Sequence, residues 1–159
     1  MSELHRSAAQ PRRLPTAVPC VRVPTFSINE AGLVTNIDVV RSIYDAFGRK
    51  DIDGLMGLLD PTVEIYQTDQ LPWGGRYRGL EGAQEFLGKL VSHIDSAVEP
   101  EELVEAGERV VEIGRSRGLV KGTGREFDVR EVHVWELRND KVVSFQSHID
   151  TPEMLRVLE

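Results

Sequence analysis

The sequence has 159 residues, of which 19 are Lys or Arg and 26 are Asp or Glu, so its formal net charge is −7. This length suits one domain, and a hydrophobic content of 40% is typical of a globular protein. No apolar run approaches the ~20 residues of a membrane-spanning helix. The single cysteine, Cys20, excludes an internal disulfide framework and a multi-cysteine zinc site.

Charge and proline content divide the chain into two parts. Residues 1–29 carry a net charge of +3, whereas residues 30–159 carry −10. Because so acidic a body repels the phosphate backbone, we expect no nucleic-acid partner. Four of the eight prolines fall within residues 1–30, where no helical or strand period is sustained. We therefore expect residues 1–30 to be a disordered or loosely docked extension and residues 31–159 to be the domain.

The first segment also bears on localisation. It lacks the unbroken apolar stretch of a secretory signal, and nothing in it indicates targeting to a compartment other than the cytoplasm. We expect a cytoplasmic protein with no membrane association.

Helical periodicity opens the domain. Apolar residues recur at a spacing of three and four after Thr35-Asn36, a good N-cap pair, and Gly48 supplies a stop. Asp51 is expected to cap a second short helix that ends at Asp60-Pro61.

Strand periodicity dominates the remainder. Residues 62–68 alternate and are rich in β-formers; a turn-rich segment, DQLPWGGRYRGLEG, separates them from a third helix over about 81–97. Four further strands are predicted at 100–106, 109–120, 126–138 and 141–149. Their short connections are typical of antiparallel neighbours, and Thr151-Pro152 opens a C-terminal helix. Helices followed by an antiparallel meander predict an α+β domain.

Several segments together resemble the SnoaL-like branch of the NTF2-like superfamily, which includes ketosteroid isomerases, limonene epoxide hydrolase and polyketide cyclases. They are the helix pair, the strand DPTVEIY, the loop WGGRYRGLEGAQEF and the closing VHVWELRNDKVVSFQSHIDTPEML, within residues 35–158. The resemblance implies a cone in which a curved antiparallel sheet wraps around N-terminal helices and encloses a mostly apolar pocket. It also implies a small apolar ligand, a homodimer formed through the outer face of the sheet, and no cofactor or metal.

The hairpin between the last two strands decides which side chains face that pocket. A two-residue turn would pair Arg138 with Lys141, whereas a three-residue loop, with Asp140 in the left-handed conformation, would pair Leu137 with Lys141. A slip of one residue moves every side chain to the other face. We adopt the three-residue loop, because it gathers the aromatic side chains on one face.

In this register His133 lies opposite Phe145, and Glu131 lies opposite Ser147. The pocket face carries Glu131, His133, Trp135, Val143, Phe145, Ser147 and Ile149. The other face carries Arg130, Val132, Val134, Gln146, His148 and Asp150. This mixed surface suits a dimer interface.

The resemblance also implies catalytic positions that this sequence mostly leaves unfilled. The carboxylate on the last strand of polyketide cyclases and the epoxide hydrolase corresponds to Ser147. The steroid isomerase's base corresponds to Ile65, its oxyanion-hole tyrosine to Ser42 and its second oxyanion donor to His133. We therefore do not expect steroid isomerisation by that mechanism.

A different catalytic set remains, formed by His133, Glu131 and Ser147. A neutral histidine in a partly apolar pocket suits a general base near pH 7, and residues two apart on a strand, about 7 Å, can flank a small molecule. His148 and Asp150 resemble a metal pair but have no third ligand at a suitable spacing, so no metal site is predicted. We expect the ligand pocket to be lined by Tyr44, Ile65, Trp73, Tyr77, Trp135, Phe145 and Ile149.

Two functions stay open at this point. One is a cofactor-independent enzyme that moves a proton on a small apolar substrate, as an isomerase, cyclase, dehydratase or epoxide hydrolase. The other is a non-enzymatic dimeric module that binds a small molecule or whose cone is filled by its own side chains. An open cavity lined by His133 and Glu131 would favour the enzyme, and a cone packed solid by Trp73, Phe145 and Ile149 would favour the second function.

Overall fold

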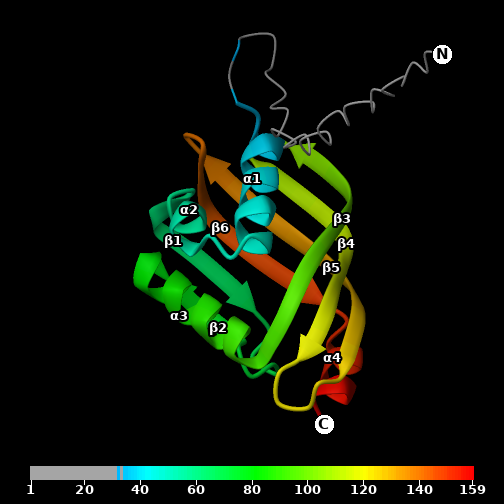
Figure 1. Cartoon of the computed structure of the whole chain (residues 1–159). Helices are drawn as coiled ribbons and strands as arrows, with labels where there is room; N and C mark the ends of the chain where they lie inside the picture. Colours follow the sequence, from blue (N-terminus) through cyan, green and yellow to red (C-terminus); the bar gives the residue numbers. More distant parts are fainter. Residues whose placement is uncertain (1–31, 33) are drawn as a thin grey trace, which may run out of the picture.

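The computed structural model describes residue 32 and residues 34–159, so the extension predicted over residues 1–30 lies outside the described residues. The described chain forms α1 (Asn36–Gly48), α2 (Ile52–Met56), β1 (Leu59–Gln67), β2 (Gly75–Arg78), α3 (Gly79–His93), β3 (Ile94–Ala106), β4 (Arg109–Val120), β5 (Glu126–Arg138), β6 (Lys141–Ile149) and α4 (Thr151–Leu158). These elements make the α+β cone that the sequence predicts (Figure 1).

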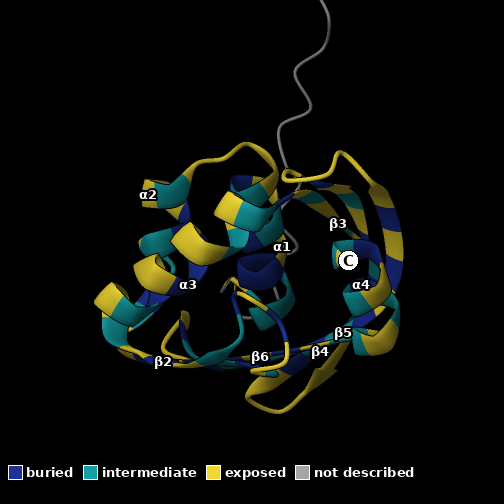
Figure 2. Ribbon diagram, turned by 90° about the horizontal axis from the view of Figure 1, so that it is seen from below, coloured by how far each residue is buried: buried dark blue, intermediate teal, exposed yellow. Residues whose placement is uncertain are grey.

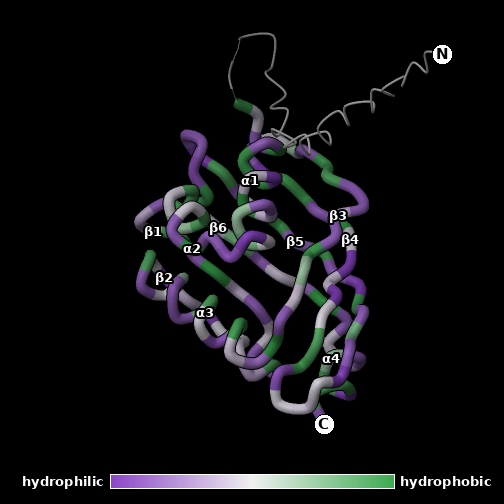
Figure 3. The backbone as a smooth tube through the Cα atoms, viewed as in Figure 1, coloured by the Kyte–Doolittle hydropathy of each residue, from purple (hydrophilic) through white to green (hydrophobic). Residues whose placement is uncertain are grey.

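One six-stranded sheet, in the order β2-β1-β6-β5-β4-β3, forms the wall of the cone. Its strands pair antiparallel except for β1 and β6, which run parallel. Figure 2 shows α1, α2 and α3 together on one side of the curved sheet, with β3 rising at its edge. Hydrophobic and hydrophilic residues alternate along much of the strands (Figure 3), as expected where one sheet face is buried and the other is not.

The predicted start of α1 is confirmed by its capping. Thr35 is the N-cap, and its side chain accepts a hydrogen bond from the backbone N–H of Asp38, whose carboxylate accepts one from the N–H of Thr35. This reciprocal capping box satisfies two amide groups that the first turn leaves free. The helix buries Val40 and Ile43 against the sheet side of the core.

The second helix is shorter than predicted. It ends at Met56, and Leu59 and Asp60 already belong to β1. The physical reason is Pro61, which biases the residue before it toward an extended backbone.

The pairing of strands overrides helical periodicity at the end of α3. The predicted helix over 81–97 instead ends at His93, and β3 runs from Ile94 rather than from residue 100. Residues 94–98 are strand because β4 is long enough to pair with them, from Ile94↔Val120 to Val98↔Ser116. The sequence analysis also missed β2, a four-residue strand on the edge beside β1.

The predicted strands at 109–120, 126–138 and 141–149 are confirmed, but the predicted β5–β6 turn is wrong. Asn139 and Asp140 both have positive φ, 52° and 59°, and Arg138 pairs with Lys141. This is a two-residue turn, which Asn and Asp favour because they tolerate the left-handed region.

A β-bulge then shifts the register by one residue. Leu137 pairs with Val142 and Glu136 with Ser144, so Val143 is the extra residue. Val142 is fully buried, whereas Val143, which was predicted to face the pocket, is half-buried.

Beyond the bulge, His133 lies opposite Ser147 and not opposite Phe145 as predicted. Glu131 lies opposite Ile149 and not opposite Ser147. Apart from Val143, the residues predicted for the pocket face still lie on one side of the sheet. The turn and the bulge together shift the pairing by two residues, and two residues restore the same side of a strand.

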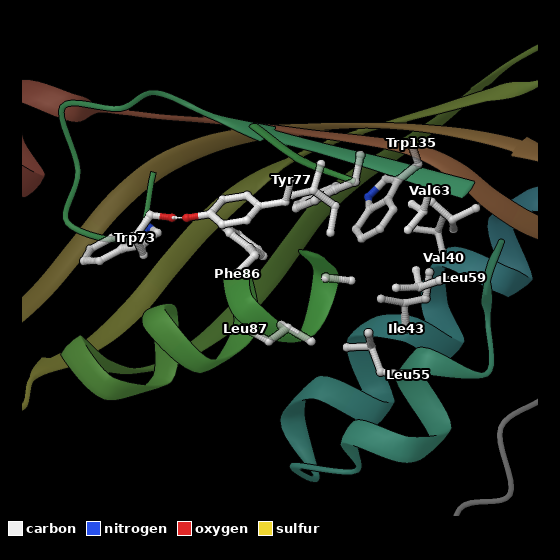
Figure 4. Packing of buried hydrophobic residues seen from close by; sticks show 14 of the residues in the cluster. Val40, Ile43, Leu55, Leu59, Val63, Trp73, Tyr77, Phe86, Leu87 and Trp135 are labelled. Carbon is white, nitrogen blue, oxygen red and sulfur yellow. Dashed lines mark hydrogen bonds between the residues drawn. The ribbon is translucent and has the colours of Figure 1, made fainter. Parts of the chain in front are cut away.

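The core fills the space between α1, α3 and the sheet. Figure 4 shows Val40 and Ile43 near Val63 at one end, and Trp73 at the other. Trp73 is 1% exposed, although it lies in the loop between β1 and β2. No helix in the described part of the chain is long and apolar enough to cross a membrane.

We expect Gly74→Ala to lower the free energy of unfolding by about 2 kcal/mol, because overpacking a closed site costs ~1–3 kcal/mol. A Cβ on Gly74 would lie 1.7 Å from the carbonyl oxygen of Thr68, in the loop that seats Trp73. Gly88 in α3 is the matched control, since a Cβ there meets nothing within 4 Å. Gly88→Ala is expected to raise stability by ~0.5–1 kcal/mol. Urea unfolding of both variants measures the difference, and equal effects would contradict the close approach at Gly74.

Candidate functional site

A cavity of about 90 Å³ lies between the helices and the concave face of the sheet. Its lining includes eight of the ten residues predicted for the site: Tyr44, Trp73, Glu131, His133, Trp135, Phe145, Ser147 and Ile149. The predicted residues therefore leave a cavity and do not pack the cone solid.

The other two predicted residues, Ile65 and Tyr77, do not line this cavity. Ile65 is buried in the core on β1, opposite Phe145 of β6. The hydroxyl of Tyr77 donates to the carbonyl oxygen of Trp73 at 2.9 Å, and its ring lies 5.5 Å from that of Phe86 (Figure 4). Tyr77 thus acts on the cavity indirectly, by holding the loop that carries Trp73.

Hydrogen bonds join three cavity residues into a chain. The indole N–H of Trp135 donates to the hydroxyl oxygen of Tyr44 at 2.9 Å, and that hydroxyl lies 2.9 Å from Nδ1 of His133. Since an indole only donates, Tyr44 accepts from Trp135, and its own proton is available for the bond to Nδ1. When Tyr44 donates to Nδ1, a neutral imidazole at this position carries its proton on Nε2, beside Glu131.

Behind His133 lies a residue that the sequence analysis missed, Glu112 on β4. It is 0% exposed, it pairs directly with His133 in the sheet, and its Oε2 lies 3.5 Å from Nδ1. The alternation along β4 could have identified Glu112, because this residue lies on the same inward face of the strand as Val110 and Ser116. An acid in the buried phase of a strand is a candidate for function, since its burial is costly.

Gly114 makes room for this carboxylate. A Cβ at Gly114 would lie 2.2 Å from Oε1 of Glu112 and 2.4 Å from the carbonyl oxygen of Glu99 on β3. Any larger residue would displace Glu112 or the neighbouring strand.

A second carboxylate approaches the opposite edge of the imidazole. Oε2 of Glu131 lies 3.4 Å from Nε2 of His133, and Glu131 is 4% exposed. Both oxygens of Glu112, and Oε1 of Glu131, are buried without a hydrogen-bond partner among the described residues. One imidazole therefore serves two carboxylates, and three acceptor atoms remain unsatisfied.

Burial changes the protonation of Glu112. It raises the pKa of Glu112 to about 7, with the charge of Glu131 acting in the same direction and that of His133 opposing it. Burial and the nearby Glu112 charge also raise the pKa of Tyr44, so that side chain stays a neutral phenol.

Glu112, Glu131 and His133 are also side chains of the kinds that bind metal ions. In the described chain, one ligand atom of each lies within 4.8 Å of the others. However, the two carboxylates lie at different imidazole nitrogens, and Nδ1 is already bonded to Tyr44. An ion binds through one imidazole nitrogen, and an ion at Nδ1 would displace the hydrogen bond to Tyr44. The arrangement as it stands suits the sharing of protons.

The predicted helper Ser147 lies on β6 directly opposite His133, and its hydroxyl makes no hydrogen bond within the described chain. The His148–Asp150 pair has a different role. His148 is exposed on the outer face, and the carboxylate of Asp150 accepts from the N–H of Glu153 as the N-cap of α4.

The family model and the similar solved structures agree on the family to which this chain is related. A family model for the SnoaL-like domain matches residues 40–145. No protein with a curated description matches the chain. An NTF2-like protein of unknown function from Burkholderia pseudomallei is 34% identical with a TM-score of 0.74, covering 79% of this chain and 98% of its own.

Two further solved structures are similar. An NTF2-like protein from Burkholderia xenovorans is 31% identical with a TM-score of 0.71, covering 78% of this chain and 95% of its own. A protein named TerC, co-crystallised with polyporic acid, is 26% identical with a TM-score of 0.72, covering 77% of this chain and 97% of its own.

We expect Glu112→Gln to stabilise the protein more at pH 8 than at pH 5. A carboxyl whose pKa rises on folding binds its proton more tightly when folded, so its contribution to stability falls as the pH rises from about 4.5 to about 7 and then levels off. Over that range the advantage of the variant should grow by about 3 kcal/mol, since one pKa unit is about 1.4 kcal/mol. Unfolding by urea at several pH values measures it.

Ser116→Ala, on the same inward face of β4, is the control and should shift stability equally at every pH. A pH-independent effect of Glu112→Gln would show that Glu112 is not the buried titrating group.

Proposed function

This chain belongs to the SnoaL-like domain family, and from that premise we propose that it is a small-molecule enzyme that works by proton transfer without a cofactor. His133 is the general acid–base group, with Glu131 and Ser147 assisting it. The substrate is a small, largely apolar molecule of the size that the cavity admits.

The observation that carries this proposal is the ionisable cluster at the polar end of an apolar cavity. Glu131 and His133 line the cavity, and Glu112 lies behind them with its Oε2 3.5 Å from Nδ1 of His133. Burying such groups costs several kcal/mol when nothing uses them, and strongly perturbed groups in a cavity are typical of active sites. Polyporic acid in the relative TerC supports a small organic ligand.

The geometry suits a division of roles. The Nε2 proton of His133 can be donated to an oxygen on which charge develops, because Tyr44 holds the other nitrogen. Glu131 then takes the proton that the substrate loses, which gives a protonated carboxyl and an enolate whose oxygen accepts a hydrogen bond from the Nε2–H of His133. Return of a proton from Glu131 to another atom of the substrate completes an isomerisation. Ser147, which lies opposite His133 in the sheet, donates a second hydrogen bond to the same oxygen in this scheme.

We expect the protein to exchange the α-protons of small cyclic ketones with solvent deuterium. Cyclopentanone and cyclopent-2-enone in D₂O, followed by proton NMR, report proton abstraction without knowledge of the natural substrate. Glu131→Gln and His133→Gln should each lower the exchange rate by about 10²-fold or more, the usual contribution of a general acid or base. His148→Gln, on the outer face, is the matched control and should exchange like the wild type.

Chelation provides a second control, since exchange should survive EDTA if the cluster shares protons and not a metal ion. If no ketone exchanges, and the His133 ring signals ignore both ligand and pH between 5 and 8, the protein is a binding module or a filled cone.

We also propose that two copies associate through the outer face of the sheet. At its centre lies an outer-face patch of four half-buried aliphatic residues, Val111, Ile113, Val132 and Val134. Val132 pairs with Ile113, and Val134 with Val111, so the patch is continuous across β4 and β5. Contiguous apolar surface of this kind marks interfaces.

Val134→Glu should therefore convert the dimer to a monomer, because a symmetric interface would bury two like charges. Sedimentation velocity measures the mass. Val91→Glu, at a residue that is 39% exposed on α3, is the control and should not change it. A monomeric wild type at 100 μM would contradict the dimer.

A further inference from the structure

The cavity has an unbalanced charge. Its lining, as the described residues form it, contains Glu131 but no Lys or Arg, and His133 is its one basic side chain. No Lys or Arg of the described chain forms an ion pair with Glu131 or Glu112. The outer-face carboxylates differ in this respect, since Glu136 is paired with Arg109 and Glu101 with Arg130.

The cluster of Glu112, Glu131 and His133 has more negative than positive charge. Two carboxylates and one imidazole carry a net charge of −2 when His133 is neutral and −1 after one proton is added. The three orphan oxygens of Glu112 and Glu131 mark where positive charge or hydrogen-bond donors are absent. A ligand that brings one positive charge, together with one proton, would neutralise the cluster.

Aromatic rings line the same cavity. The rings of Trp135 and Phe145 are stacked 4.1 Å apart, and Tyr44 meets Trp135 edge to face at 5.7 Å. Aromatic faces attract a cation and also bury apolar groups. The lining thus combines a carboxylate, which attracts an ammonium group, with aromatic side chains that can pack against the carbon skeleton of an amine.

We propose that the cavity selects a small alkyl amine in its protonated form, with the ammonium group at Glu131 and the alkyl body against Trp135 and Phe145. This goes beyond the proposed function: the amine is a ligand of the same pocket and not the substrate, because an ammonium group at Glu131 would occupy the carboxylate that takes the substrate proton. A cavity of about 90 Å³ is smaller than the ~150 Å³ that admits benzene, so ligands of four or five heavy atoms fit best. Anions of the same shape are rejected because they meet a buried carboxylate.

Three probes of similar shape test this: isobutylamine and isobutanol, which have five heavy atoms each and differ in charge, and the anion isobutyrate, which has six. At pH 7.5 the amine is cationic, as a lysine side chain is, with a pKa near 10.4. The chain has two tryptophans, and both line the cavity, so the two indole N–H signals in a ¹⁵N NMR titration report binding directly. We expect the amine to bind about tenfold more tightly than the alcohol, the usual gain from a hydrogen bond to a charged group, and isobutyrate not to bind.

Glu131→Gln should remove most of that preference, lowering amine affinity about tenfold and leaving isobutanol within about twofold of the wild type. Glu131→Asp keeps the charge and should keep the order amine over alcohol, which separates charge from altered packing. His148→Gln, on the exposed outer face of the sheet, is the control and should also keep that order.

The outcomes separate the two proposals. Equal binding of amine and alcohol to the wild type, or tighter binding of isobutyrate, would overturn the amine inference and leave proton transfer on a neutral substrate intact. Failure of all three probes to shift either indole signal would overturn both, because the cavity would not admit ligands. A preference for the amine that persists unchanged in Glu131→Gln would also overturn the assignment to Glu131.

Discussion

The imidazole of His133 lies between two buried carboxylates, and this contact constrains the structure around it. Glu112 and Glu131 meet its two nitrogens at 3.5 and 3.4 Å in a region without Lys or Arg. In a low-dielectric interior such charges are tolerated only when they are partnered or lose charge by binding a proton. The strands hold them there because β4 and β5 pair along their length, and because Gly114 leaves space for a carboxylate.

The cluster and its two neighbours, Tyr44 and Ser147, come from four different elements. Tyr44 lies on α1, Glu112 on β4, Glu131 and His133 on β5, and Ser147 on β6. The Trp135–Tyr44–His133 hydrogen bonds fasten the first helix to the sheet and at the same time orient the imidazole. Stability and site geometry therefore depend on the same contacts, and a change in the packing of α1 would alter the proton positions on His133.

The SnoaL-like fold does not by itself decide the chemistry, because one fold hosts many functions. Here the last strand offers Ser147 where cyclase-like members are expected to carry a carboxylate, and the negative charge lies instead on β5 and β4. The polar end of the cavity is thus built from neighbouring strands, with a hydroxyl facing the imidazole. An apolar cavity with one acidic end can bind a small molecule and position it against a proton donor.

Local pattern in the sequence determined the start of α1 at Thr35, three long strands and the inward face of β5, because capping and periodicity depend on neighbouring residues. Eight of the ten residues predicted for the site, including His133 and Glu131, line the cavity. Tertiary structure alone decided the bulge at Val143, which places Ser147 opposite His133, and the pairing that brings Glu112 behind the imidazole. Register and the balance of buried charge arise from residues far apart in the chain, so no local pattern contains them.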